Sequence, residues 1–197
     1  MIRLTDISGI VLAAGNSSRM EGGNKLLLPW GEMCVVQSVV EEVFGVGLGG
    51  VFVAAGYQGE DVEKTISGYP VRVVHNPDFC EGMASSIRVG VAAAQGKGYL
   101  LVLGDMPKVK GETMGKVVAV MGYEKVIVVP VIGERWGNPV GVGGAYRDEL
   151  LGLSGDRGAR SIVRKYLGNV IEVEVRDLGI FVDVDTREAY RKARGQG

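Results

Sequence analysis

The chain has 197 residues and a formal net charge of −1, so its overall charge favours neither nucleic acid nor an anionic membrane surface as a partner. With 46% hydrophobic and 23% charged residues, it has the composition of a folded protein and not of a disordered or fibrous one. Its two cysteines, Cys34 and Cys80, are too few for a disulfide framework or a zinc site. We therefore expect a cytoplasmic protein, with both thiols in the core, that folds as a single domain over residues 1–197.

Short apolar runs rich in β-branched residues alternate with segments of helical spacing. In chain order, the predicted strands are 7–13, 51–55, 71–75, 99–103 and 126–131, and the predicted helices between them are 35–44, 60–66, 83–94 and 113–120. Nearly continuous apolar runs are typical of strands that are buried on both faces of a parallel sheet. Beyond these, the pattern predicts strands at 138–142 and 170–175 and helices at 159–166 and 187–194. The sequence thus predicts an α/β fold with a mixed-sheet extension.

The loop after the first predicted strand combines small residues, hydroxyl groups and two cations. The residues concerned are Gly15, Asn16, Ser17, Ser18, Arg19 and Lys25. They follow the carboxyl end of a strand, where open α/β sheets bind their ligands. Backbone N–H groups, an Arg fork and a mobile Lys suit a polyphosphate. The alternative is a solvated loop with incidental charges.

Three carboxylates are predicted at the same edge of the sheet. Asp105 follows the strand 99–103, while Asp183 and Asp185 occupy alternate positions of an extended segment and therefore point the same way. Carboxylate oxygens are suitable ligands for Mg²⁺, which takes one or two of them and keeps several waters. The alternative for Asp185 and Thr186 is that they cap the final helix.

The chain contains a single histidine, His75, at the end of a predicted strand. A histidine-based catalytic triad is therefore not expected. A phosphate monoester is already a nucleophilic dianion near neutral pH, so it needs no strong general base. We expect catalysis by positioning and charge neutralisation, with Mg²⁺, Arg19, Lys25 and Asp105 as the catalytic groups.

Six segments together resemble the nucleotidyltransferases related to the molybdenum cofactor guanylyl- and cytidylyltransferases. These segments are LAAGNSSRM with Lys25, EGMASSIRVGV, LGDMP, GNPVGV, GDRGAR and DVDTREAY. The resemblance implies a Rossmann-like three-layer α/β/α sandwich with a predominantly parallel, mixed sheet, of the nucleotide-diphospho-sugar transferase type. The chain departs from the family at Trp136, where a basic residue is frequent before GNPV.

The resemblance also implies roles for individual residues. In this family LAAG is typical of cytidylyltransferases, so it points to CTP, bound by residues of the first loop together with Leu12, Ala13, Ala14, Gly82, Ser86 and Gly104. Mg²⁺ would be held by Asp105 and Asp183. The acceptor side would include Asn138, Pro139 and Arg160.

The leading hypothesis is transfer of CMP from CTP to the phosphate of a small acceptor, molybdopterin, with release of pyrophosphate. Two alternatives stay open. One is the same chemistry on a sugar or alditol phosphate, and the other is a non-catalytic nucleotide-binding protein that serves a molybdoenzyme or its chaperone. A nucleotide-sugar glycosyltransferase, which the DxD at Asp183 to Asp185 would allow, leaves the LAAG loop with Arg19 and Lys25 unexplained.

Overall fold

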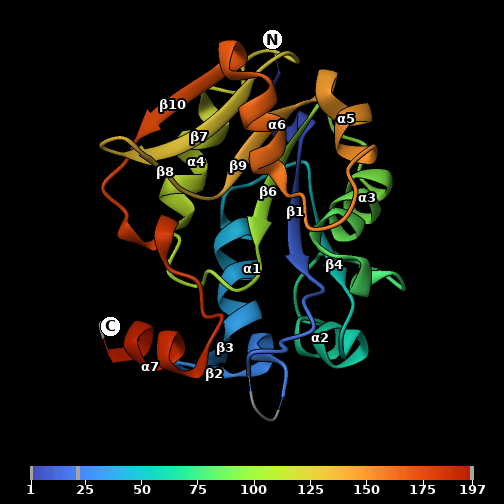
Figure 1. Cartoon of the computed structure of the whole chain (residues 1–197), viewed down its shortest axis with the longest axis vertical. Helices are drawn as coiled ribbons and strands as arrows, with labels where there is room; N and C mark the ends of the chain where they lie inside the picture. Colours follow the sequence, from blue (N-terminus) through green and yellow to red (C-terminus); the bar gives the residue numbers. More distant parts are fainter. Residues whose placement is uncertain (1, 21–22, 196–197) are drawn as a thin grey trace.

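The computed structural model describes residues 2–20 and 23–195, and its centre is an eight-stranded sheet lying between helices (Figure 1). The strands are ordered β10-β7-β9-β6-β1-β4-β5, with β8 paired to β7. Strand β9 runs antiparallel to both of its neighbours, and the pairs β5–β4, β4–β1, β1–β6 and β7–β10 are parallel. The predicted sheet, mostly parallel with a mixed extension, is confirmed.

The described strands are β1 (Ile7–Ala13), β2 (Pro29–Trp30), β3 (Met33–Cys34), β4 (Gly50–Ala55), β5 (Arg72–His75), β6 (Gly98–Leu103), β7 (Ile127–Ile132), β8 (Arg135–Trp136), β9 (Val140–Gly143) and β10 (Val170–Glu174). The described α-helices are α1 (Val35–Gly45), α2 (Gly59–Thr65), α3 (Met83–Ala93), α4 (Gly111–Ala119), α5 (Arg147–Leu151), α6 (Ala159–Lys165) and α7 (Arg187–Gly195). Strands β2 and β3 form a separate two-stranded hairpin.

Alternating side chains of the central strands pack against two different layers of helices. In β1, Val11 belongs to a core cluster with α1 and α4, whereas its neighbour Ile10 belongs to a second cluster with α3 and α5. This alternation is the strand period of two acting on a sheet that is buried on both faces. The three-layer arrangement expected from the resemblance is therefore confirmed.

Helix α3 lies unusually close to the sheet because of a glycine. A Cβ at Gly90 would meet Cγ2 of Ile10 at 2.4 Å. The close approach fixes α3 against β1, and the first turns of α3 then lie beside the carboxyl end of that strand. Among the described residues, no helix is long and apolar enough to cross a membrane.

The carboxyl ends of β1, β4 and β6 meet at one edge of the sheet. Ala13 is paired with Ala55, and Leu12 with Leu103. Strand β9 is antiparallel and begins at this edge, since Val140 pairs with Leu101. The residues that follow β1 and β6 and those that precede β9 are thereby brought together, although they are far apart in the sequence.

Candidate active site

Three adjoining cavities follow the carboxyl edge of the sheet. The loop cavity, of about 540 Å³, is lined by the residues after β1 and by the start of α3, and the middle cavity, of about 490 Å³, lies against α6. The outer cavity, of about 460 Å³, lies between β8 and the segment that contains Phe181. Asp183 lines all three cavities. The cavities therefore form one trough with Asp183 at the junction.

Lys25 lies in the loop cavity with its ammonium group between two carboxylates. Its Nζ forms ion pairs with Asp105 and with Asp185, and Arg19 NH1 reaches the other oxygen of Asp185 at 3.3 Å. The Lys25 side chain is 11% exposed, and that of Arg19 is 73% exposed. Of the three predicted catalytic groups, Lys25 and Asp105 are thus paired directly, and Asp185 links Arg19 to Lys25.

Burial and pairing act in opposite directions on these groups. Burial tends to lower the pKa of Lys25, but the two carboxylates outweigh it and the pKa is raised. For Asp105, burial dominates over the attraction of Lys25, so the pKa is raised. Burial tends to raise the pKa of Asp185 as well, but its hydrogen bond and charge interactions with Lys25 lower it. The single positive charge of Lys25 therefore compensates the negative charge of Asp105 and Asp185 only in part.

The peptide between the two aspartates of the C-terminal segment anchors that segment to the sheet. The backbone N–H of Val184 donates to the carbonyl of Asp105 at 2.9 Å, and the Val184 side chain is fully buried in the core. With Val184 pointing inward, Asp183 and Asp185 both line the loop cavity. The expected common orientation of the two carboxylates is confirmed.

The final helix is capped by Thr186, and Asp185 has a different role. Thr186 Oγ1 accepts a hydrogen bond from the backbone N–H of Ala189 at 3.0 Å. The carboxylate of Asp185 instead contacts Lys25 and Arg19. The structure thus separates the two functions that the sequence left open at these neighbouring positions.

We expect Thr186→Ala to lower the free energy of unfolding by about 1 kcal/mol, because an N-cap hydrogen bond is lost. Thermal or chemical unfolding measures this change. Turnover should stay near the wild-type value, since Thr186 lines none of the three cavities among the described residues. A Thr186→Ala protein of unchanged stability would contradict the capping role.

Ser17, Ser18 and Arg19, all predicted nucleotide contacts of the first loop, do not line the loop cavity. Ser17 Oγ accepts from the backbone N–H of Lys25 at 3.0 Å and lies 3.4 Å from Asn24 Oδ1. Asn24 in turn donates to the carbonyl of Tyr57 at 2.9 Å. Ser17 therefore closes the loop and holds Lys25 in place, and neither Ser17 nor Ser18 lines the loop cavity. Gly15 and Asn16 do line it.

Ala14 forms part of the inner wall of the loop cavity, and a glycine makes its position possible. A Cβ at Gly56 would lie 2.6 Å from Cβ of Phe79 and 2.8 Å from Cβ of Ala14. Ala14 and Phe79 both line the cavity, and Gly56 lies between them. Their present positions therefore require that residue 56 has no side chain. Leu12 also lines the cavity, whereas Ala13 is buried in the core.

Two predicted nucleotide-binding glycines have packing reasons of their own. At Gly82, with φ of 103°, a Cβ would meet Oδ1 of Asp156 at 2.4 Å, so the loop before α6 lies directly over it. Gly82 also lines the loop cavity. At Gly104 a Cβ would meet the carbonyl oxygen of Leu12 at 2.8 Å, and Gly104 lines none of the cavities among the described residues. Gly104 therefore shapes the edge by letting β6 approach β1.

The middle and outer cavities are rich in arginine. Arg160 and Arg164 line both cavities, one helical turn apart on α6, and Arg157 adds a third guanidinium to the middle one. Arg160 also donates to the carbonyl of Trp136 at 3.3 Å. Asn138 lines both cavities, while Pro139, after a cis peptide bond, is buried and lines neither.

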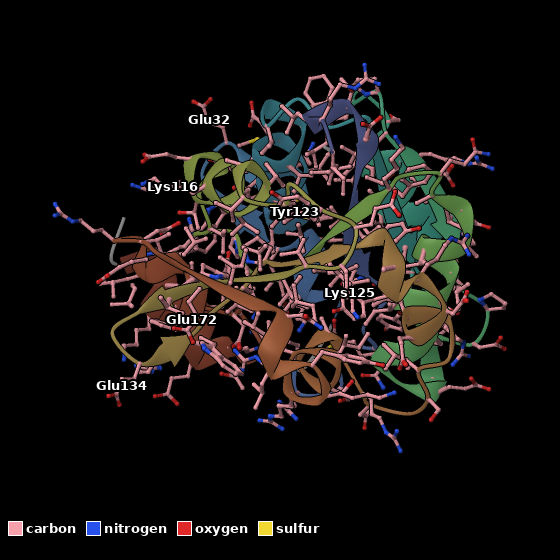
Figure 2. All side chains as sticks on the ribbon, turned by 90° about the horizontal axis from the view of Figure 1, so that it is seen from above. Glu32, Lys116, Tyr123, Lys125, Glu134 and Glu172 are labelled. Atoms are coloured by element: carbon pink, nitrogen blue, oxygen red, sulfur yellow. The ribbon has the colours of Figure 1, made fainter. Side chains whose placement is uncertain are left out.

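Trp136, the departure from the family pattern, stands at the outer cavity. Its Nε1 donates to Glu172 at 2.6 Å, and the neighbouring Arg135 lies over the ring of Phe181 at 4.3 Å. Figure 2 shows Glu134 and Glu172 at the same outer side of the molecule. The outer end of the trough thus combines two aromatic rings with charges of both signs.

Several cavity residues were not identified from the sequence. These are Leu26, Phe79, Cys80, Met83 and Asp156 in the loop cavity, and Arg135, Arg157 and Arg164 farther along. The prediction that both thiols are core residues is wrong for Cys80, which is exposed, whereas Cys34 is buried. Cys80 lies in a short 3-10 helix, Phe79–Glu81, that lines the loop cavity, and not in a buried strand.

The carboxylates suit a hard divalent cation. Asp105 and Asp183 present oxygen donors to the same cavity, and Lys25 compensates the negative charge there only in part. Within residues 2–20 and 23–195, no group of three His, Cys, Asp or Glu side chains is arranged to hold a metal ion. Mg²⁺ commonly takes only one or two protein carboxylates together with substrate phosphates, so the pair fits such an ion.

Comparisons with known proteins agree with this geometry. The MobA-like NTP transferase domain matches residues 9–170. The chain is 30% identical to nicotine blue oxidoreductase of Paenarthrobacter nicotinovorans, an alignment that covers 92% of this chain and 93% of that protein. It is 24% identical to molybdenum cofactor cytidylyltransferase of Escherichia coli K12, over 97% of both chains.

Solved structures show the same fold. A nucleotidyl transferase from Methanothermobacter thermautotrophicus superposes with a TM-score of 0.87 at 28% identity, covering 96% of each chain. Rv0371C of Mycobacterium tuberculosis, solved in complex with manganese, superposes with a TM-score of 0.84 at 28% identity, covering 97% of this chain and 99% of the other. The nucleotide-diphospho-sugar transferase type of fold is thereby confirmed.

Proposed function

The chain belongs to the MobA-like NTP transferase family, and on that basis we propose that it transfers CMP from CTP to a phosphorylated acceptor, molybdopterin, and releases pyrophosphate. The observation that carries this proposal is the position of Lys25, paired with Asp105 and Asp185, in the loop cavity of the trough. Lys25 offers an ammonium group to a triphosphate in the loop cavity, and the middle cavity adjoins it for a second substrate. The similarity to molybdenum cofactor cytidylyltransferase supports both the nucleotide and the acceptor.

Each part of the trough then has a chemical task. The loop cavity holds the nucleotide, with Lys25 against its phosphates. Arg19 does not line the cavity but pairs with Asp185, which does. Asp105 and Asp183 would hold Mg²⁺, which when bound neutralises phosphate charge and polarises the phosphorus. The acceptor phosphate, approaching from the middle cavity, needs no general base because it is a dianion near neutral pH. Arg160 and Arg164 hold the acceptor and orient it toward the junction.

The arginines indicate what kind of acceptor fits. A guanidinium fork is suited to phosphate and carboxylate oxygens, and the middle and outer cavities together carry four of them, Arg135, Arg157, Arg160 and Arg164. The rings of Trp136 and Phe181 offer a flat apolar contact beside them. An anionic acceptor with a planar ring system, as in molybdopterin, fits this combination better than a sugar or alditol phosphate does.

The test is pyrophosphate release from protein, CTP and Mg²⁺ in the presence of molybdopterin, a sugar phosphate or an alditol phosphate, each assayed separately. We expect release with molybdopterin and with neither of the other acceptors. Release with a sugar phosphate would keep the reaction but replace the acceptor. CTP binding without release for any acceptor would favour the non-catalytic accessory protein.

An oxidoreductase is a second candidate, because one relative at 30% identity is named nicotine blue oxidoreductase. The paired carboxylates and ammonium around Lys25 favour phosphate chemistry over it. Bleaching of nicotine blue by the protein with a reduced nicotinamide nucleotide, without pyrophosphate release from CTP, would support the redox function instead.

Nucleotide choice depends on the wall at Ala14. We expect the wild-type protein to prefer CTP to GTP, and Ala14→Gly to reduce the ratio of the two kcat/KM values by about five- to tenfold without inverting it, which is the lower end of the effect of one methyl group in a pocket, about 1 to 1.4 kcal/mol. Steady-state kinetics with both nucleotides measure the ratio.

Ala13→Gly is the matched control, because the Ala13 methyl group is buried in the core and does not line the loop cavity. It should leave the CTP-to-GTP ratio unchanged. A wild-type preference for GTP would overturn the cytidylyl assignment and spare the nucleotidyltransferase one.

A further inference from the structure

A buried polar network lies directly behind the loop cavity, and two of its three members, Asn76 and Ser85, have no role in the reaction described above. Its members are Asn76, which is 2% exposed, and the adjacent serines of α3, Ser85 and Ser86, which are 1% and 6% exposed. Only Ser86 of the three lines the loop cavity. The network therefore reaches the cavity at a single hydroxyl group.

The direction of the Asn76 amide is fixed by the backbone. Its Oδ1 accepts a hydrogen bond from the backbone N–H of Asp78 at 3.0 Å. A backbone N–H can only donate, so the oxygen of the amide must face Asp78 and the NH₂ group must face the other way. That NH₂ group donates to Ser85 Oγ at 2.8 Å and to Ser86 Oγ at 3.1 Å.

Both serines must then accept, which leaves each with one hydrogen to donate. Ser85 donates its hydrogen to the carbonyl of Gly82 at 2.8 Å. The hydroxyl hydrogen of Ser86 has no protein acceptor in the part of the chain that the structure describes, and the cavity is the open direction. Ser86 thus presents a hydrogen-bond donor to whatever occupies the loop cavity.

We propose that Asn76 is a positioning residue for nucleotide binding, which forces Ser86 to donate its hydroxyl hydrogen to an acceptor atom on the nucleotide base. This inference rests on the proposed function for the identity of the occupant. Cytosine offers two such acceptors, O2 and N3. Ala14, Leu26 and Phe79 line the same cavity with apolar side chains, which offer no acceptor to the Ser86 hydroxyl group.

Asn76→Asp tests the direction of the hydrogen bond with little change in shape. A carboxylate can only accept, so Ser86 would turn its hydrogen toward the introduced carboxylate and offer a lone pair to the base. Isothermal titration with all four ribonucleoside triphosphates in Mg²⁺ first identifies the nucleotide that the wild-type protein binds most tightly. The variants are then titrated with that nucleotide, and thermal unfolding reports whether each is folded.

We expect Ser86→Ala to weaken binding about three- to tenfold, which corresponds to one neutral hydrogen bond. Ser85→Ala, the matched control on the same amide, should change binding by less than about twofold because Ser85 does not reach the cavity. Asn76→Asp should weaken nucleotide binding by about tenfold in the wild-type background, where the Ser86 hydroxyl group is present. In the Ser86→Ala background, the same substitution should weaken binding by less than about twofold.

Equal loss from Asn76→Asp with and without the Ser86 hydroxyl would overturn the proposal, because Asn76 would then act on the fold and not through Ser86. Unchanged binding in Ser86→Ala would overturn it as well, and this comparison does not require Asn76→Asp to fold. Tightest binding of a nucleotide other than CTP would overturn the proposed nucleotide and leave the role of Asn76 to be decided by the variants. Absence of binding to all four nucleotides would overturn both.

Discussion

Lys25→Ala should lower kcat by about 10²- to 10³-fold, the loss that follows when one preorganised group facing transition-state charge is removed from an enclosed site. The Lys25 ammonium group is largely buried, so solvent screens it little, and it lies in the loop cavity, where the triphosphate would bind. The variant also leaves Asp105 and Asp185 without their shared cation, which disfavours an approaching triphosphate. We therefore expect both a lower kcat and a higher KM for CTP, with the larger change in kcat.

The fold should survive this substitution. Ser17 holds the loop through the backbone N–H of Lys25, which an alanine retains. Lys116→Ala is the matched control, because Lys116 is also a lysine paired with a carboxylate, Glu112 at 2.8 Å, but lies on the exposed surface of α4. Kinetics should be unchanged in that control. A folded Lys25→Ala protein with turnover within threefold of wild type, where about 10²-fold is expected, would remove Lys25 from the mechanism.

The sequence predicted the sheet because each central strand carries its own signal. Strand β1 was predicted with the observed bounds, and β4, β6 and β7 within one residue, because strands buried on both faces are continuously apolar. Strands β2, β3 and β8 were missed, since two residues are too few to establish a period. Helix α5, of five residues, was missed for the same reason.

The residues of the candidate site that could be predicted are chemically reactive or charged residues that follow the carboxyl ends of predicted strands or alternate in an extended segment. Lys25, Asp105 and Asp183 follow from charged residues at strand ends and from alternation in an extended segment. Gly56 and Asn76 could not be identified in this way, because their importance depends on partners that only the folded chain supplies. Gly56 matters through the distance between Ala14 and Phe79, and Asn76 matters through the direction of one amide.

Asp156 and Arg164 lie between the residues that could be predicted from the sequence and those that could not. Both lie in or after the GDRGAR motif, which the sequence analysis noted without assigning a role to either residue. Asp156 lies over Gly82 because that glycine has no side chain. Arg164 reaches the middle and outer cavities because it lies one helical turn after Arg160. A helical wheel drawn from Arg160 would have found the second arginine.

Asp105→Asn should abolish metal-dependent turnover while leaving the protein as stable as wild type. The amide keeps the size of the carboxylate but loses the charge that would hold Mg²⁺, and a metal ion contributes several kcal/mol to the neutralisation of transition-state charge, a loss on the order of 10³-fold in rate. Stability should change by less than about 1 kcal/mol, because burial already disfavours the Asp105 charge and Lys25 keeps its second partner, Asp185.

Asp183→Asn separates metal binding from the charge balance at Lys25. Asp183 lines the same cavity but makes no ion pair with Lys25 among the described residues. Its replacement should therefore raise the Mg²⁺ concentration needed for half-maximal pyrophosphate release more than it lowers the rate at saturating Mg²⁺. In Asp105→Asn, by contrast, no Mg²⁺ or Mn²⁺ concentration should restore the rate. Titration of both ions against wild type and the two variants, with unfolding curves for each, decides this, and full turnover of Asp105→Asn at any metal concentration would exclude Asp105 as a ligand.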